Sequence, residues 1–251
     1  MAGSAVYDEI GVGYARFRRP DPSIESAIHA ALGRARTVLN VGAGTGSYEP
    51  SDRTVTAVDA SAEMIRQRPA HAAPCRQGDA SSLDFPDRFF DAAMAVLTVH
   101  HWDRPRRGLR ELSRVAGGVV VLTFDPAMHN QFWLFRDYVP AITKLASTAG
   151  AIGVDEVAEV IYADRIDPVP VPHDCLDGFG TAYWRRPERY LDPAVRRCIS
   201  AFGLLPPEDV APGLRRLAAD LDSGRWHERY RELLDLDSID AGLRLVVRGW
   251  R

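Results

Sequence analysis

A glycine-rich segment in the first quarter of the chain has the composition of a ligand-binding loop. It follows a short apolar run and consists of Gly42, Ala43, Gly44, Thr45 and Gly46. Because glycine lacks a Cβ atom, such a backbone turns sharply and its amide groups can approach a ligand closely. Dinucleotide-binding loops are similar, but Ser47 stands here where the third glycine of G-x-G-x-x-G would be. The spacing therefore disfavours a nicotinamide dinucleotide.

An acidic residue follows at a distance typical of a ribose-binding carboxylate. Asp59 ends a second apolar run, 19 residues after Asn40. A carboxylate in this position can accept hydrogen bonds from both ribose hydroxyls. Taken alone, Asp59 is equally typical of a turn or a helix cap. In combination with the glycine loop we interpret it as a ribose-binding residue.

Strand and helix patterns that would position these residues alternate from residue 24 to residue 125. We expect strands at 36–41, 54–60, 89–99 and 117–125, a weaker strand around Cys75, and helices at 24–35, 61–68 and 104–116. Ser23 is the expected N-cap of the first helix. Such alternation predicts an α/β protein with a doubly wound parallel sheet.

The half of the chain after residue 125 is less regular. The aromatic-rich segment 129–142 is expected to be helical up to Pro140, and a second helix is expected at 153–163. An edge strand within 165–175, a series of broken helices and a last strand at 241–250 would follow. We interpret residues 1–251 as one domain. Within it, residues 24–125 would bind a cofactor and residues 126–240 would form substrate-side helices and insertions.

Composition narrows the class of protein. The net charge of −3 does not favour a nucleic-acid partner. The three cysteines, Cys75, Cys175 and Cys198, form neither a disulfide framework nor a CxxC metal pair, so we expect reduced thiols and no metal. The N-terminus lacks the pattern of a signal peptide, and no apolar run approaches the roughly 20 residues of a membrane span. We therefore expect a cytoplasmic monomer or homodimer without a membrane partner.

Four segments taken together resemble the class I S-adenosylmethionine-dependent methyltransferases, in particular the small-molecule branch that includes the ubiquinone and menaquinone methyltransferases. They are residues 38–49, 55–61, 78–102 and 117–125, and the resemblance covers roughly residues 7–125. It departs at Asn40, where the family usually carries an acidic residue. The resemblance implies a Rossmann-like fold: a seven-stranded, mostly parallel sheet with a helical N-terminal segment and helical C-terminal insertions that form a cap.

The resemblance also implies S-adenosyl-L-methionine as cofactor and S-adenosyl-L-homocysteine as product. The glycine loop would flank the methionine and ribose parts of the cofactor, Asp79 would accept the adenine amino group, and Tyr14 and Arg19 would reach the carboxylate. The full set of implied cofactor-binding residues is Tyr14, Arg19, Gly42, Ala43, Gly44, Thr45, Gly46, Asp59, Ala60, Met64, Gly78, Asp79, Ala80, Leu97 and Thr98.

Methyl transfer needs a base only where the acceptor carries a proton of high pKa. His100 and His101 follow the fourth main strand and are the candidate bases, although one imidazole would serve equally as a loop cap or pack on the cofactor. The candidate substrate-binding residues follow the next strand: His129, Phe132, Trp133 and Tyr138. Their aromatic rings are typical either of a helix core or of a pocket wall.

Several functions remain open on the sequence alone. We favour methyl transfer to a small aromatic or natural-product-like molecule by in-line displacement. A non-catalytic cofactor-binding or regulatory protein of the same fold is the main alternative. A protein or nucleic-acid methyltransferase is less favoured, because Thr98-Val99-His100-His101-Trp102 replaces the Asn/Asp-Pro-Pro-aromatic motif of base-modifying enzymes and no basic stripe is present.

Overall fold

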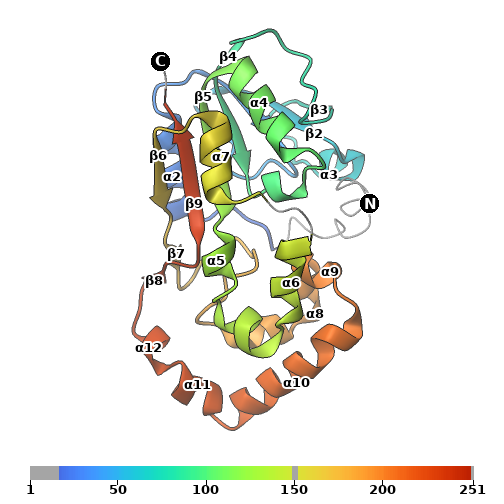
Figure 1. Cartoon of the computed structure of the whole chain (residues 1–251), viewed down its shortest axis with the longest axis vertical. Helices are drawn as coiled ribbons and strands as arrows, with labels where there is room; N and C mark the ends of the chain where they lie inside the picture. The colour runs from blue at the N-terminus through green and yellow to red at the C-terminus, as the bar shows by residue number, and fades with distance from the viewer. Residues whose placement is uncertain (1–16, 149–151, 250–251) are drawn as a thin grey trace.

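The computed structural model describes residues 17–148 and 152–249; Tyr14 lies outside the described residues. Two parts share this chain (Figure 1): a sheet flanked by helices, and a group of shorter helices beyond the ends of the strands. We call the second part the cap.

In the described part of the chain, seven strands form the central sheet. They are β1 (Thr37–Val41), β2 (Thr54–Asp59), β3 (Cys75–Gln77), β4 (Phe90–Val96), β5 (Ala116–Phe124), β6 (Arg165–Pro168) and β9 (Leu243–Arg248). Their order is β3-β2-β1-β4-β5-β9-β6, and only β9 runs antiparallel to its neighbours. The predicted seven-stranded, mostly parallel, doubly wound sheet is confirmed.

Helices cover both faces of this sheet, which explains the continuous apolar sequence of its central strands. The flanking helices are α2 (Pro22–Leu32), α3 (Ala62–Arg66), α4 (Pro105–Val115) and α7 (Val154–Ile161). Successive side chains of a strand point to opposite faces. Val119 and Val121 of β5 accordingly share a buried cluster with α4 and α7, whereas Val120 and Leu122 pack with α2.

The first helix begins earlier than the sequence predicted. Asp21, not Ser23, is its N-cap, and Pro22 takes the first helical position. The Asp21 carboxylate accepts hydrogen bonds from the backbone N–H groups of Ser23 and Ile24. Both Asp and Ser can cap a helix, so the preceding proline, which suits the first turn, decides the boundary.

The segment after β5 differs from the single helix that the sequence predicted from His129 up to Pro140. It consists of α5 (Pro126–His129), the π-helical turn η3 (Leu134–Tyr138) and α6 (Ala141–Thr148). Pro140 lies between the last two, where its missing N–H interrupts the helical hydrogen bonds. The other cap elements are η4 (Pro187–Leu191), α8 (Pro193–Arg197), α9 (Ser200–Gly203), α10 (Pro207–Asp222), α11 (Arg225–Arg229), α12 (Arg231–Leu234) and the paired strands β7 (Val171–Pro172) and β8 (Ser238–Ile239).

Residues 126–240 are not confined to the substrate side as predicted. Within them, α7 packs against α4 and β9, and β6 pairs with β9 to form one edge of the central sheet. Both lie beside β9 in Figure 1, away from the cap. The chain thus leaves the sheet after β5, returns for α7 and β6, and leaves it again for most of the cap before β9.

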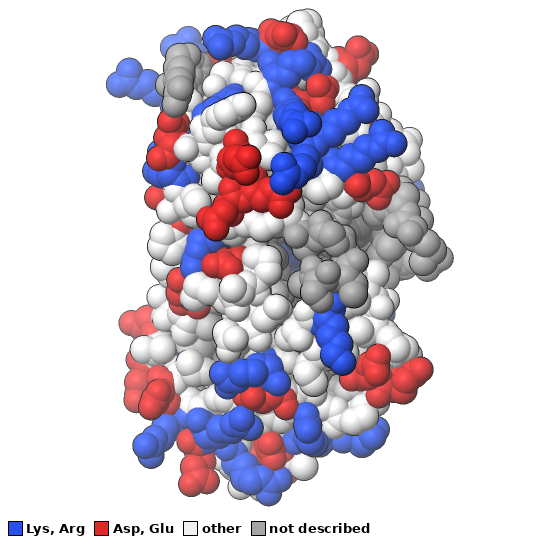
Figure 2. Space-filling model, in the orientation of Figure 1, with Lys and Arg blue, Asp and Glu red and all other residues white. Residues whose placement is uncertain are grey.

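The surface carries charges of both signs. On the face drawn in Figure 2, basic and acidic side chains are interspersed over the sheet part and over the cap. Among the helices that the structure describes, none is long and apolar enough to cross a membrane.

Candidate active site

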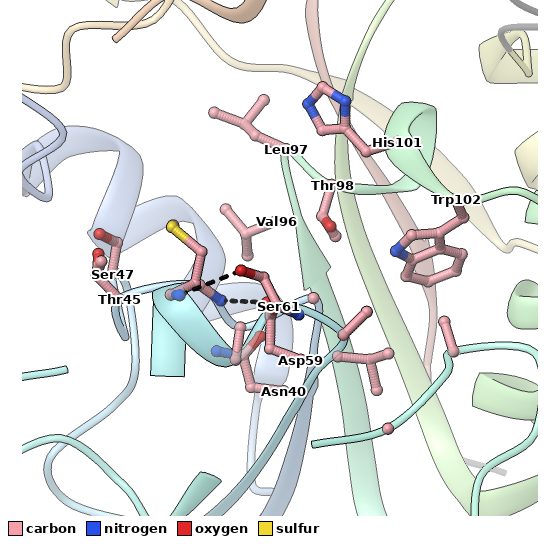
Figure 3. Close-up of a pocket in the computed structure, with 18 of the residues that line it drawn as sticks. Asn40, Thr45, Ser47, Asp59, Ser61, Val96, Leu97, Thr98, His101 and Trp102 are labelled. Carbon is pink, nitrogen blue, oxygen red and sulfur yellow. Dashed lines mark hydrogen bonds between the residues drawn. The ribbon is translucent and has the colours of Figure 1, made fainter. Parts of the chain in front are cut away.

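A cavity of about 280 Å³ opens at the carboxyl ends of β1, β2 and β4 (Figure 3). The strand order reverses between β1 and β4, and ligands of open α/β sheets bind at such a point. We call it the first cavity. Its lining includes the predicted cofactor-binding residues Gly42, Ala43, Gly44, Thr45, Asp59, Ala60, Met64, Gly78, Asp79, Ala80, Leu97 and Thr98.

The glycine loop packs closely around this cavity. Gly42, Gly44 and Gly46 all have positive φ values, 69°, 51° and 93°. A Cβ atom on Gly42 would lie 2.1 Å from Oγ1 of Thr98. The backbone N–H groups of Gly42 and Ala43 donate to the carbonyl of Val58, which ties the loop to β2. Gly46 does not line the first cavity and serves the turn itself.

Asp59 joins the loop to the end of β2. One carboxylate oxygen accepts from the Gly44 N–H at 2.7 Å, and the other accepts from the Ser61 N–H at 2.8 Å (Figure 3). Burial raises the pKa of Asp59, although these hydrogen bonds and nearby Arg68 oppose the shift. Asp59 lines the first cavity, and a carboxylate has about four lone-pair sites, so the group can accept hydrogen bonds beyond these two.

A buried ion pair between Glu49 and Arg68 stabilises the glycine loop. Asn40 donates its side-chain amide to Glu49 at 3.0 Å, and Glu49 pairs with Arg68 at 2.7 Å. Arg68 also donates to the carbonyl of Gly44. The departure at Asn40 therefore has a local reason: an acidic residue there would face the carboxylate of Glu49, whereas the amide donates to it.

Asp79 also lines the first cavity and lies in the segment that follows β3. Its carboxylate accepts from the backbone N–H of Ser81 at 2.7 Å and from the Ser81 hydroxyl at 2.8 Å. The backbone hydrogen bond is the main reason that the pKa of Asp79 is lowered. Trp102 and Asp103 line the same cavity. The group offers an aromatic surface beside an ionised acceptor.

A second cavity of about 170 Å³ adjoins the first on the cap side and shares Arg18, Leu97 and His101 with it. It lies between β4, β5 and the cap. The sequence-predicted residues that line it are Leu97, His100, His101 and His129. His100 and His101 form the 3-10 turn η2 (Val99–His101), and their ring centroids are 3.9 Å apart.

The three imidazoles of the second cavity are held neutral. Burial lowers the pKa of His100 and of His129 to about 4, and at His100 the neighbouring His129 and Arg18 lower the pKa further by smaller amounts. Burial also lowers the pKa of His101 well below its usual range. A neutral imidazole can donate one hydrogen bond and accept one, and it can accept a proton.

Arg18, not Arg19, reaches the two cavities. Arg19 is exposed and lines neither of them. The guanidinium of Arg18 pairs with the buried carboxylate of Asp177 at 2.5 Å, and the same carboxylate accepts from the hydroxyl of Tyr48 at 2.9 Å. Contrary to the prediction, the structure therefore does not place Arg19 at the cavity, and its neighbour Arg18 lines both cavities instead.

Three of the predicted substrate residues belong to the core of the cap. Phe132, Trp133 and Tyr138 are buried and do not line the second cavity. The indole N–H of Trp133 donates to the carbonyl of Trp184, and the hydroxyl of Tyr138 donates to Asp220. Their placement supports the helix-core interpretation rather than the pocket wall.

Sequence reasoning did not identify several residues that line the cavities. In the first these are Arg18, Val41, Ser47, Tyr48, Ser61, Val96, Trp102 and Asp103, and in the second they include Thr123, Phe124, Phe135, Ile142, Phe179 and Ile199. Ser61 and Trp102 belong to the segments that resemble the family, so the sequence alone could have identified them. In the second cavity, Thr123 and Phe124 end β5, whereas the other residues come from separate parts of the cap, so no local pattern in the sequence relates them.

Comparison with known proteins agrees with this geometry. A methyltransferase domain family matches residues 39–122. A putative methyltransferase from an antibiotic biosynthesis pathway of Anabaena variabilis ATCC 29413 is 32% identical in sequence, and its crystal structure superposes with a TM-score of 0.85 over 94% of this chain and 100% of that one.

Relatives that are named for a substrate match a smaller part of this chain. The chloroplastic 2-methyl-6-phytyl-1,4-hydroquinone methyltransferase 1 of Oryza sativa subsp. japonica is 34% identical over 53% of this chain and 43% of its own length, so the chain spans less than half of it. The demethylmenaquinone methyltransferase of Mycolicibacterium paratuberculosis is 27% identical over 61% of this chain and 69% of its own length. Together with the domain match and the full-length structural relative, these similarities show that the chain belongs to the S-adenosylmethionine-dependent methyltransferases, whose cofactor is S-adenosyl-L-methionine.

Proposed function

We propose that this chain transfers the methyl group of S-adenosyl-L-methionine to a small, mainly apolar molecule. The observation that carries the proposal is the pair of adjoining cavities: one has the donor and acceptor groups for a nucleoside, the other is mainly apolar, and Arg18, Leu97 and His101 line both. Such an arrangement would hold two reactants side by side, and alignment supplies much of the rate enhancement in bimolecular reactions.

The first cavity fits the cofactor. Asp59 would accept hydrogen bonds from the ribose hydroxyls, and Asp79 would accept one from the adenine amino group, beside Met64 and Ala60. Gly42 lets the loop pack directly against Thr98, because a Cβ atom at this position would collide with the threonine side chain. Arg18 would approach the carboxylate of the cofactor. When bound, the cofactor supplies an electrophilic methyl group, so the protein needs to orient the acceptor and remove a proton.

His101 is the best-placed proton acceptor. It lines both cavities, whereas His100 lines only the second. Since burial keeps the pKa of His101 well below its usual range, the ring is neutral at physiological pH and one of its two nitrogens is unprotonated, as a proton acceptor requires. The acceptor is a ring compound in this proposal because the plant and mycobacterial relatives are named for a hydroquinone and a menaquinone. A cytoplasmic location is part of the same proposal.

Two measurements test the function. Thermal unfolding with S-adenosyl-L-methionine, S-adenosyl-L-homocysteine, NAD and NADP should show stabilisation by the adenosyl compounds alone; stabilisation only by the nicotinamides would refute the proposal. Asp59→Asn should weaken S-adenosyl-L-homocysteine binding about 10- to 100-fold, the usual range for a hydrogen bond to a charged group. Transfer of a labelled methyl group to a panel of phenols, indoles and carboxylates then tests catalysis. Binding without any transfer would favour the non-catalytic alternative.

A further inference from the structure

The second cavity contains two imidazoles that make no hydrogen bond within the described part of the chain. Nδ1 of His100 and Nε2 of His129 are buried without a hydrogen-bond partner among the described residues. Both imidazoles lie near the ring of Phe124: its centroid is 6.0 Å from that of His100 and 4.8 Å from that of His129. Buried polar groups are normally satisfied, so an unsatisfied pair in one cavity calls for an explanation.

The other nitrogen of each ring is in a different environment. Nε2 of His100 and Nδ1 of His129 are neither sealed in the protein nor hydrogen-bonded to a described residue, and both residues line the second cavity. Because both residues line the second cavity and these nitrogens are the accessible ones, a ligand bound there can reach them. A sealed lone pair is tolerated more readily than a sealed N–H, which favours the tautomers that present an N–H to the cavity. Two donors facing an apolar space fit an oxygen atom.

The charges of the residues that line the second cavity restrict the class of ligand further. None of the described residues that line the second cavity is Asp or Glu. Its one guanidinium, on Arg18, is paired with Asp177. The imidazoles are neutral because burial lowers the pKa of His100 and His129 to about 4. A cationic ligand would lose its hydration without gaining a counter-ion, whereas a neutral oxygen can be hydrogen-bonded.

The rest of the wall determines size and shape. Phe124, Phe135, Phe179, Ile142 and Ile199 surround the space, whose volume is about 170 Å³. An apolar cavity of roughly 150 Å³ holds a benzene molecule. The second cavity therefore accommodates one aromatic ring with small substituents, while larger parts of a ligand would extend from it.

We propose that the second cavity selects an uncharged aromatic ring bearing a hydroxyl or carbonyl oxygen, and that His100 and His129 are the specificity-determining residues that hydrogen-bond this oxygen. The inference rests on the proposed function, of which it names the acceptor class. It assigns His129, at the end of α5, a role toward the ligand that the aromatic residues Phe132 and Trp133 do not have.

Matched ligands test this selectivity. The chain is saturated with S-adenosyl-L-homocysteine and titrated calorimetrically with p-cresol, toluene and 4-methylbenzylamine, which differ only in a hydroxyl, a hydrogen atom and a cationic group. We expect p-cresol to bind at least roughly tenfold more tightly than either of the others, as one satisfied hydrogen bond would provide. Equal affinities of p-cresol and toluene, or no binding of p-cresol, would overturn the inference.

Substitutions of His100 and His129 test whether these residues cause the preference for p-cresol. His100→Phe and His129→Phe keep a ring of similar size and should each reduce the preference for p-cresol over toluene at least threefold, and the double variant should abolish it. His129→Asn, which retains a donor, should keep more of the preference than His129→Phe. His71→Phe is the matched control, because His71 is exposed and lines neither cavity. An unchanged preference in the double variant would refute the assignment.

The two proposals fail separately. Binding of S-adenosyl-L-homocysteine is measured first in every variant and confirms that the variant is folded. If the wild-type chain does not bind it, the proposed function fails, and the hydroxyl preference is then measured without it. If it binds but p-cresol is not preferred, only the acceptor class is wrong.

Discussion

Replacing Gly42 by alanine tests how closely the loop and β4 enclose the first cavity. Gly42 has a φ of 69°, and its new Cβ atom would lie 2.1 Å from Oγ1 and 2.8 Å from Cβ of Thr98. Thr98 follows directly after the strand β4 and Leu97, and it lines the cavity. Neither the loop, which hydrogen-bonds to Val58, nor the end of β4 can move without disturbing the site.

Two costs add in this variant. The left-handed conformation costs an L-residue roughly 1–2 kcal/mol, and overpacking a tight site costs roughly 1–3 kcal/mol. We therefore expect Gly42→Ala to lower the free energy of unfolding by about 2–5 kcal/mol, and to weaken S-adenosyl-L-homocysteine at least tenfold, about 1.4 kcal/mol, because the displaced Thr98 lines the cavity. Gly224→Ala is the matched control: its φ is 77°, but nothing lies within 4 Å of the new Cβ atom.

Urea unfolding and calorimetric titration measure the two effects. Gly224→Ala should show only the conformational cost and unchanged ligand affinity. The double variant Gly42→Ala, Thr98→Gly should recover part of the lost stability, since it removes the atoms that the Cβ would meet. The reasoning is refuted if Gly42→Ala is no less stable than Gly224→Ala and binds the ligand as tightly as the wild type.

Two further predictions concern buried groups. Arg18→Met should lower the free energy of unfolding by about 3–5 kcal/mol, because it leaves the buried carboxylate of Asp177 with Tyr48 but without its cation; in urea unfolding, adding Asp177→Asn should cost little more, and strictly additive losses would contradict the pairing. The pKa of His100 and of His129 lies at about 4 in the folded chain against 6.5 for an ordinary imidazole. The unfolded chain therefore binds protons first as pH falls, so stability is full above pH 6.5 and declines toward pH 4, by at most about 1.4 kcal/mol per pH unit for each ring. Replacing both by Phe should make the decline between pH 7.5 and 4.5 shallower, and an unchanged slope would show that these rings are not buried as neutral groups.

The first cavity could be predicted largely from the sequence because its groups belong to local turns. A glycine loop after one strand and an acid after the next are each determined within a few residues, and parallel strands bring their carboxyl ends to the same edge. Gly42, Asp59 and Asp79 accordingly line the predicted cavity. The sequence did not distinguish between chemically similar residues that lie close together. Asp21 caps the first helix in place of Ser23, and Arg18 reaches the cavities in place of Arg19.

Only the tertiary structure decided the acceptor side. Phe124, Phe179 and Ile199 come from β5 and from two distant parts of the cap, and no short-range pattern relates them. Phe132 and Trp133 have the composition of a pocket wall, yet they pack inside the cap, because an aromatic side chain in a broken helix can face either way until its partners are in place. Periodicity and local turns in the sequence thus predicted the alternating α/β fold and the glycine loop with Asp59, and the family resemblance added the cofactor. The lining of the second cavity, on which the proposed choice of acceptor rests, depends instead on which side chains the folded cap brings together.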